Sequence, residues 1–129
     1  METLGHKVIQ NWRPRCHPDG FDFEIWSVEY LKELDARLPV SSKDREWFAQ
    51  YALETDGNGF SVKASHNLSH WRLTVDYPED LEVVRKIYQA MGDEIWDSRT
   101  VIEWLMRNRK VLEGNQMHVK DFGARPVES

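Results

Sequence analysis

The 129-residue sequence lacks several features that mark particular classes of protein. Its only cysteine, Cys16, has no partner within the chain for a disulfide, so nothing indicates an oxidising compartment. The first residues, METLGHKVIQNW, have neither the apolar core nor the cleavage site of a signal peptide. No apolar run approaches the roughly 20 residues that a membrane-spanning helix needs. We therefore expect a cytoplasmic protein without a membrane partner.

Basic side chains are in the minority, because 17 Lys and Arg stand against 22 Asp and Glu, for a net charge of −5. Binding to a phosphate backbone needs a basic face, so we expect no nucleic-acid partner. Neither standard type of glycine-rich phosphate loop occurs. Hydrophobic residues make up 40% of the chain and six residues are Trp, which indicates a globular protein with an aromatic core or interface. The length predicts a single domain over residues 1–129.

Strands and helices are expected to alternate along the chain. Apolar alternation predicts strands over 7–12, 21–27, 60–65 and 71–76, with another short one possible in QMHV (116–119). Helical spacing predicts helices capped by Ser27 and by Ser41 or Ser42, and further helices over 78–91 and 98–110. The alternation indicates an α/β fold, a mixed sheet with flanking helices. About four strands is few for such a sheet, so the chain resembles the second half of a larger one.

Asp76 is the first candidate functional residue. It ends a predicted strand just before a helix that begins at Pro78, and functional groups of α/β sheets gather at such carboxyl ends. It could simply cap the helix, although Pro78 removes one backbone donor. Otherwise its carboxylate is available to a metal or a substrate. Glu79 and Asp80 are expected to be ordinary charges of the first helical turn.

Asp22 and Glu24 would share one face of the predicted strand 21–27. On an exposed edge they would be solubility residues, which the residues alone favour. On a face toward a cleft they could bind sugar hydroxyls or help to hold a divalent ion.

Three further groups have simpler interpretations. His66 and His70 are four residues apart, but they lie between predicted strands with no cysteine nearby, so loop histidines are expected rather than a zinc site. Cys16 and His17 are adjacent in a proline-rich loop, where they are poorly placed to activate each other. Arg45 and Glu46 lie in the first turns of a helix, where ion pairs to solvent are common.

Three stretches together resemble the cytidylyltransferases that activate sugars with CTP. They are QNWRPRCHPDGFDFEIWS (10–27), the pair Arg45-Glu46, and RLTVDYPEDLE (72–82). The likeness is greatest to the spore-coat polysaccharide biosynthesis type, and CMP-sialic acid and CMP-Kdo synthetases are more distant relatives. Order and spacing match over about residues 7–120. The sequence departs from the family pattern at Tyr77, where Thr is usual, and at WFAQ after Arg45-Glu46.

The resemblance implies part of a nucleotide-diphospho-sugar transferase-like sandwich. This chain would be its C-terminal, sugar-side and dimerisation portion, and the nucleotide-binding half would precede Met1 and be absent. The complete enzyme would convert CTP and a sugar to a CMP-sugar and pyrophosphate, and this portion alone would be inactive. The alternative is a non-catalytic remnant that binds a sugar or associates with a subunit; a homo-oligomer is expected in either case.

The resemblance also implies roles for individual residues. Asp76 would be catalytic and would be a ligand of Mg²⁺, the expected cofactor. Five residues would bind substrate, namely Asp22, Glu24, Arg45, Arg72 and Asn11.

Overall fold

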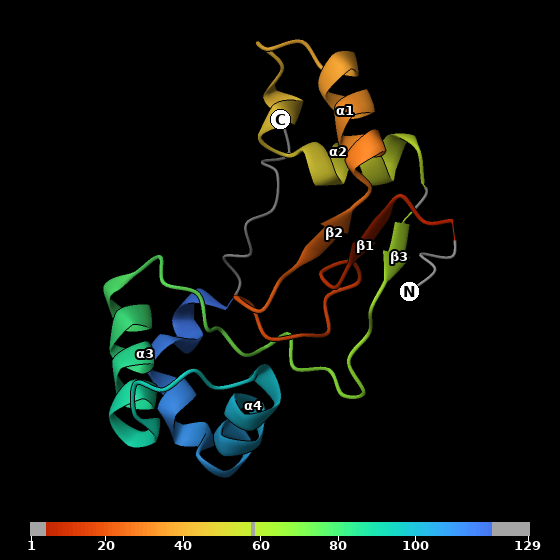
Figure 1. Cartoon of the computed structure of the whole chain (residues 1–129). Coiled ribbons are helices and arrows are strands. Elements are labelled where there is room, and N and C mark those ends of the chain that lie inside the picture. Colours follow the sequence, from red (N-terminus) through yellow and green to blue (C-terminus); the bar gives the residue numbers. More distant parts are fainter. Residues whose placement is uncertain (1–4, 58, 120–129) are drawn as a thin grey trace. The chain divides into compact units, whose positions relative to one another are not determined.

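The computed structural model describes residues 5–57 and 59–119, which form parts of two compact units (Figure 1). Unit 1 takes its described residues from Met1–Arg15 and Phe23–Lys63, and unit 2 from Cys16–Asp22 and Ala64–Ala124. In these ranges, no helix has both the length and the apolar character needed to cross a membrane. That the chain forms a single domain stays a prediction.

Unit 1 contains a three-stranded mixed sheet. Strand β1 (Val8–Gln10) lies between β2 (Glu24–Trp26) and β3 (Gly59–Ser61), so the order is β2-β1-β3 (Figure 1). The pair β1–β2 is antiparallel and the pair β1–β3 is parallel. This sheet, together with its helices, confirms the predicted α/β class.

A hydroxyl cap starts α1 (Val28–Arg37) as predicted, whereas the helix expected after Ser41 or Ser42 is divided in two, and its longer part, α2 (Phe48–Thr55), has no side-chain cap. Ser27 accepts a hydrogen bond from the Tyr30 backbone N–H and begins α1. Ser42 likewise begins the short 3-10 helix η1 (Lys43–Arg45), and α2 follows. The core is formed by buried side chains of β1, α1 and α2, namely Val8, Tyr30, Leu34 and Ala52.

A charged pair joins the end of α2 to α1. The carboxylate of Asp56 accepts hydrogen bonds from Arg37 Nη1, at 2.9 and 3.0 Å, and from the Tyr30 hydroxyl. The bonds from Arg37 and then Tyr30 lower the pKa of Asp56 to about 2. Burial, followed by the bond to Asp56, raises the pKa of Tyr30. The ionised form of Asp56 therefore stabilises the packing of the two helices.

Unit 2 is largely helical. It contains α3 (Pro78–Met91), α4 (Ser98–Arg107) and the 3-10 helix η2 (Arg109–His118), around the buried Trp71, Val83, Leu105 and Leu112. The predicted helix 78–91 is confirmed, and α4 ends three residues earlier than predicted. The strand considered for QMHV is wrong, because residues 116–118 continue η2. The Leu112 and Asn115 side chains, three residues apart on η2, are both buried.

The predicted strand over 71–76 is wrong. Only a single parallel bridge forms there, between Asp19 and Arg72, with bonds from Asp19 N–H to Trp71 O and from Leu73 N–H to Asp19 O. The partner segment turns away immediately, because Gly20 has φ +99°. A side chain at Gly20 would also lie 2.8 Å from the Leu73 carbonyl carbon. The turn therefore stops the ladder after one residue.

The predicted strand 21–27 is shorter than expected, because β2 begins only at Glu24. A turn precedes it, in which Phe21 N–H bonds to Pro18 O at 3.2 Å. Asp22 belongs to unit 2 and Glu24 to unit 1. The prediction that these two carboxylates share one strand face is therefore wrong.

Candidate functional site

Arg72 is the centre of a charged cluster in unit 2. Its side chain is only 1% exposed, and three carboxylates pair with it. Nε lies 2.8 Å from Asp80 Oδ1, Nη2 lies 2.7 Å from Asp76 Oδ2, and Nη1 lies 3.3 Å from Asp19 Oδ2. A buried guanidinium requires such partners, because removing a charge from water is costly unless it is paired and hydrogen-bonded.

Asp80 is fully buried and joins the cluster to the start of α3. Besides Arg72, its carboxylate accepts the side-chain N–H of Asn115, at 2.9 Å, and the backbone N–H groups of Asp76 and Tyr77, at 3.1 and 3.0 Å. Burial alone would raise the pKa of Asp80, but the bonds from Arg72 and these N–H groups outweigh it and hold the pKa well below its usual range. Asp80 is the third residue of α3, so it caps the helix from within.

Asp76 presents its carboxylate at the surface of this buried cluster. Its side chain is 60% exposed, and its Oδ2 accepts from Arg72 Nη2 and from Thr74 Oγ1 at 3.3 Å. The backbone N–H of Asp76 is held by Asp80. No donor from α3 bonds the Asp76 carboxylate among the residues described, so it is not the helix cap. An exposed carboxylate on a rigid, buried support is suited to contacting a ligand.

Tyr77 contributes an aromatic stack rather than the hydroxyl cap of Thr. Its ring lies parallel to that of His118, with centroids 3.9 Å apart, and Arg72 Cζ lies 5.4 Å from its centroid. His118 Nε2 also lies 3.3 Å from Glu79 Oε2. The bonds from its own backbone N–H and from His118 lower the pKa of Glu79. Glu79 thus has the role expected of a first-turn charge, whereas Asp80 does not.

The described residues do not fit a complete magnesium site. Mg²⁺ prefers several oxygen ligands in a near-octahedral arrangement. All three carboxylates pair with Arg72, and those of Asp19 and Asp80 are largely buried, which leaves Asp76 as the accessible carboxylate of the cluster. In the described part of the chain there is no group of three or more His, Cys, Asp or Glu side chains that could hold a metal ion. The same finding gives no support for zinc at His66 and His70.

Asn11 and Glu24 are occupied by hydrogen bonds within unit 1. Asn11 is 2% exposed, and its Oδ1 accepts the backbone N–H of Phe23 at 2.8 Å. The Glu24 carboxylate accepts both nearby indole N–H groups, from Trp12 at 2.8 Å and from Trp26 at 3.0 Å. These contacts fix the loop and strand that follow β1. The predicted roles of Asn11 and Glu24 in substrate binding stay predictions.

Arg45 binds the C-terminal end of α1. Its guanidinium donates to the carbonyl oxygens of Leu38 and Pro39 and pairs with Asp35 Oδ1 at 2.7 Å. A cation at this position complements the negative pole of the helix. Arg45 therefore has a local structural role, and its predicted role in substrate binding also stays a prediction.

The sequence-based interpretation missed the buried partners of Arg72. The sequence predicts Asp80 as an ordinary charge of the first helical turn, and it does not indicate Asp19 or Asn115 as members of the site. One signal was available for Asp80, since an acidic residue at the third helical position often bonds back to the N-cap backbone. Asn115 gave no such signal, because it reaches Asp80 and Arg72 O only through the packing of η2.

Comparison with known proteins gives one informative likeness. No protein-family model matches the chain, and no curated protein does. Among solved structures, a cytidylyltransferase from Leptospira borgpetersenii serovar Hardjo-bovis is similar, with a TM-score of 0.75 and 23% sequence identity. The match covers 85% of this chain and 47% of that one, so the chain spans about half the length of that protein. At this identity the likeness establishes that the chain shares the fold of a portion of that cytidylyltransferase.

Proposed function

We propose that the chain is the sugar-side portion of a CTP-dependent cytidylyltransferase that forms a CMP-sugar and pyrophosphate. The fold it shares with the Leptospira cytidylyltransferase supports this, as do the three motifs quoted above. The motifs favour the spore-coat type, with a product used in surface polysaccharide biosynthesis. Because the match covers 47% of that protein, we assign the nucleotide-binding half to a part of the enzyme outside this chain.

The observation that carries the proposal is the placement of Asp76. Its exposed carboxylate lies two residues before α3 and is held by Arg72, which is buried. Transfer of a nucleotidyl group from CTP to a sugar, with release of pyrophosphate, depends on positioning and on stabilisation of the phosphate charge. We assign to Asp76 the contact with the reacting substrates, and to Arg72 the positioning of Asp76. Magnesium stays a prediction, in which Asp76 supplies one ligand and the other ligands come from outside the described residues.

The test begins with the genomic sequence that precedes Met1. An in-frame strand followed by a Gly- and Arg-rich loop is expected there, and the longer protein should release pyrophosphate from CTP and a sugar. Asp76→Ala should abolish that release, whereas the matched surface variant Glu113→Gln should leave it unchanged. The 129-residue chain alone should show none.

Two results would contradict parts of this proposal. If no such strand and loop are encoded in frame before Met1, the enzymatic proposal is excluded and the non-catalytic alternative is left. Pyrophosphate release by the 129-residue chain itself, lost in Asp76→Ala, would mean that the chain is not an incomplete portion.

The alternative, a module that associates with another subunit, is favoured by an apolar row across the sheet of unit 1. Ile9 pairs with Ile25 on one side and with Phe60 on the other. Paired residues lie on the same face of a sheet, and Ile25 is 51% and Phe60 46% exposed. Exposed apolar surface on a short open sheet promotes pairing between chains. A homo-oligomer should therefore form through this face.

Sedimentation of the chain at micromolar concentrations tests this alternative. The wild type should sediment as a dimer or larger species, and Phe60→Lys should sediment as a monomer. Val40→Lys is a matched control, because Val40 is 90% exposed outside the sheet. A monomeric wild type at high concentration would exclude the association.

A further inference from the structure

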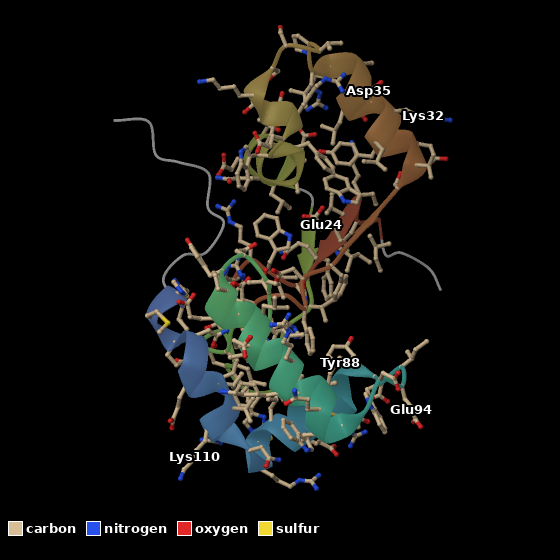
Figure 2. All side chains as sticks on the ribbon, turned by 90° about the vertical axis from the view of Figure 1, so that its left-hand side faces the viewer. Glu24, Lys32, Asp35, Tyr88, Glu94 and Lys110 are labelled. Carbon is tan, nitrogen blue, oxygen red and sulfur yellow. The ribbon has the colours of Figure 1, made fainter. Side chains whose placement is uncertain are left out.

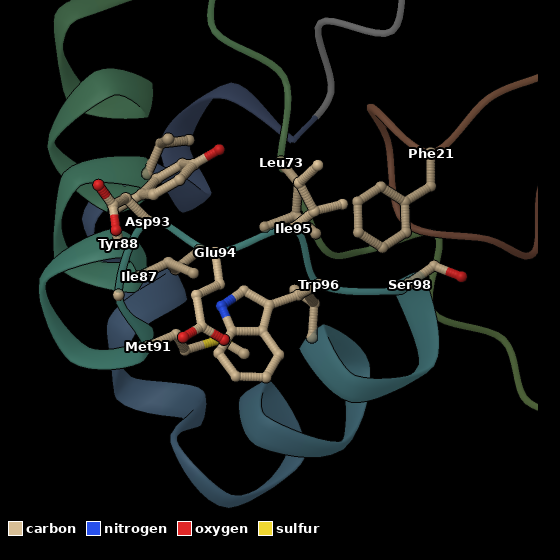
Figure 3. A pocket seen from close by; sticks show the side chains of 13 residues that line it. Phe21, Leu73, Ile87, Tyr88, Met91, Asp93, Glu94, Ile95, Trp96 and Ser98 are labelled. Atoms are coloured by element: carbon tan, nitrogen blue, oxygen red, sulfur yellow. The ribbon is translucent and has the colours of Figure 1, made fainter.

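A pocket of about 500 Å³ lies in unit 2, and its lining residues include neither Asp76 nor Arg72 (Figure 3). Its volume falls in the range of small-molecule sites. It is formed by the end of α3, the start of α4 and the loop that joins them, which carries Glu94, Ile95 and Trp96 (Figure 3). The other lining residues include Phe21, Leu73 and Tyr88.

The floor and walls of this pocket are mainly apolar and aromatic. Several of these side chains are unusually open to solvent, since Ile95 is 102%, Tyr88 56% and Trp96 40% exposed. Figure 2 shows Tyr88 extending outward from unit 2, and Glu94 does the same. Exposed apolar side chains gathered around a pocket are typical of a ligand site rather than of ordinary surface.

The charged side chains that line the pocket are both acidic. Asp93 and Glu94 line it, and neither is ion-paired within the described residues. The lining includes no Lys, Arg or His. The pocket also lies at the C-terminal end of α3, whose last turn carries no basic residue to balance the negative pole of the helix. Acidic side chains, an unbalanced helix end and aromatic rings all favour a cation.

We infer that this pocket binds a small organic cation, a molecule with an apolar body and one positive group. The apolar body would occupy the space between Phe21, Leu73 and Trp96. The positive group would lie near Asp93 and Glu94, where an indole or phenol face can also attract it. A second copy of this chain is a poorer occupant, because a symmetric contact would bring these unpaired carboxylates of two chains together.

Three probes of one shape test this inference on the full 129-residue chain. They are 3-phenylpropan-1-amine, which is cationic at pH 7, the neutral 3-phenylpropan-1-ol and the anionic 4-phenylbutanoate. Titration followed by ¹H–¹⁵N NMR should shift the backbone signals of residues 92–98 at millimolar concentrations. The amine should bind about threefold or more tightly than the alcohol, and the anion most weakly, because partly exposed charge pairs contribute modestly.

Variants of the pocket distinguish the contribution of the ligand's charge to affinity from that of its apolar body. Glu94→Gln should reduce the preference for the amine over the alcohol, and the charge-matched control Glu113→Gln should leave it unchanged. Trp96→Ala should weaken the binding of all three probes, and Trp96→Phe should restore that binding. Amide spectra of each variant establish that it is folded.

Equal affinity for the amine and the alcohol in the wild type would overturn the inference. So would shifts spread over surfaces outside the pocket. If the wild type is a dimer that Trp96→Ala converts to monomers, a second copy covers the pocket and the inference is wrong.

Discussion

Replacing Asp80 with Asn should destabilise unit 2 far more than its small change in size suggests. The two carboxylate oxygens of Asp80 accept five hydrogen bonds. Oδ1 accepts from Arg72 Nε and Asn115 Nδ2, and Oδ2 accepts from Arg72 Nη2 and the backbone N–H groups of Asp76 and Tyr77. In an Asn side chain an NH₂ group replaces one of these oxygens. In either orientation, that NH₂ group would face two or three N–H groups to which it cannot bond.

The expected loss is about 3–5 kcal/mol of unfolding free energy, the usual cost of leaving one member of a buried ion pair alone. Arg72, which is 1% exposed, would lose its fully buried carboxylate partner and retain Asp19, at 3.3 Å, and the exposed Asp76. The first turn of α3 would also lose its internal cap. Small domains are stable by about 5–15 kcal/mol, so this is a large share.

Urea denaturation followed by circular dichroism, with amide exchange in α3, measures this loss. Asp76→Asn is the matched control, because it removes a carboxylate from the same guanidinium on a side chain that is 60% exposed. It should cost no more than about 1 kcal/mol. If the two variants lose similar stability, or if Asp80→Asn costs less than about 1 kcal/mol, the assignment of Asp80 as the main partner of Arg72 is refuted.

Two further predictions concern pH and the turn at Gly20. The pKa of Asp56 is lowered to about 2, so its contribution to stability is present above pH 4 and should disappear as the pH falls from about 4 to about 2. Acid titration of stability should show this decline in the wild type and less of it in Asp56→Asn; identical profiles would contradict the prediction. Gly20→Ala should cost about 1–3 kcal/mol, because φ is +99° and the new Cβ would lie 2.8 Å from backbone atoms. Gly57→Ala, with φ +63° and no atom within 4 Å, should cost less in the same denaturation experiment, and an equal cost would exclude the close approach as the cause.

Features of the fold that depend on local sequence were predictable. Ser27 caps α1 and Pro78 begins α3 because a hydroxyl acceptor and a fixed φ act within one helical turn. The mixed α/β class followed from the alternation of such segments. The apolar alternation over 71–76 predicted a strand that does not form. The segment that faces it turns at Gly20, so that a single bridge forms, between Asp19 and Arg72.

The candidate site was predictable only at its surface. Asp76 stood out because it ends one element and precedes another, and its exposed carboxylate agrees with that interpretation. The network beneath it depends on Asp19 and Asn115, which lie 53 and 43 residues from Arg72 in sequence. Contacts at such separations arise from tertiary packing, so no local pattern could indicate them.

The network of Asp80 has a consequence for how unit 2 opens. One carboxylate joins residue 72, the start of α3 and Asn115 of η2, so each of the three loses a hydrogen bond to the shared Asp80 when it separates. These segments should therefore exchange their amide hydrogens as one cooperative unit, with a shared free energy of opening, rather than fraying independently. The exposed end of α3 near Gly92, which lies far along the helix from Asp80, should open separately and at lower cost.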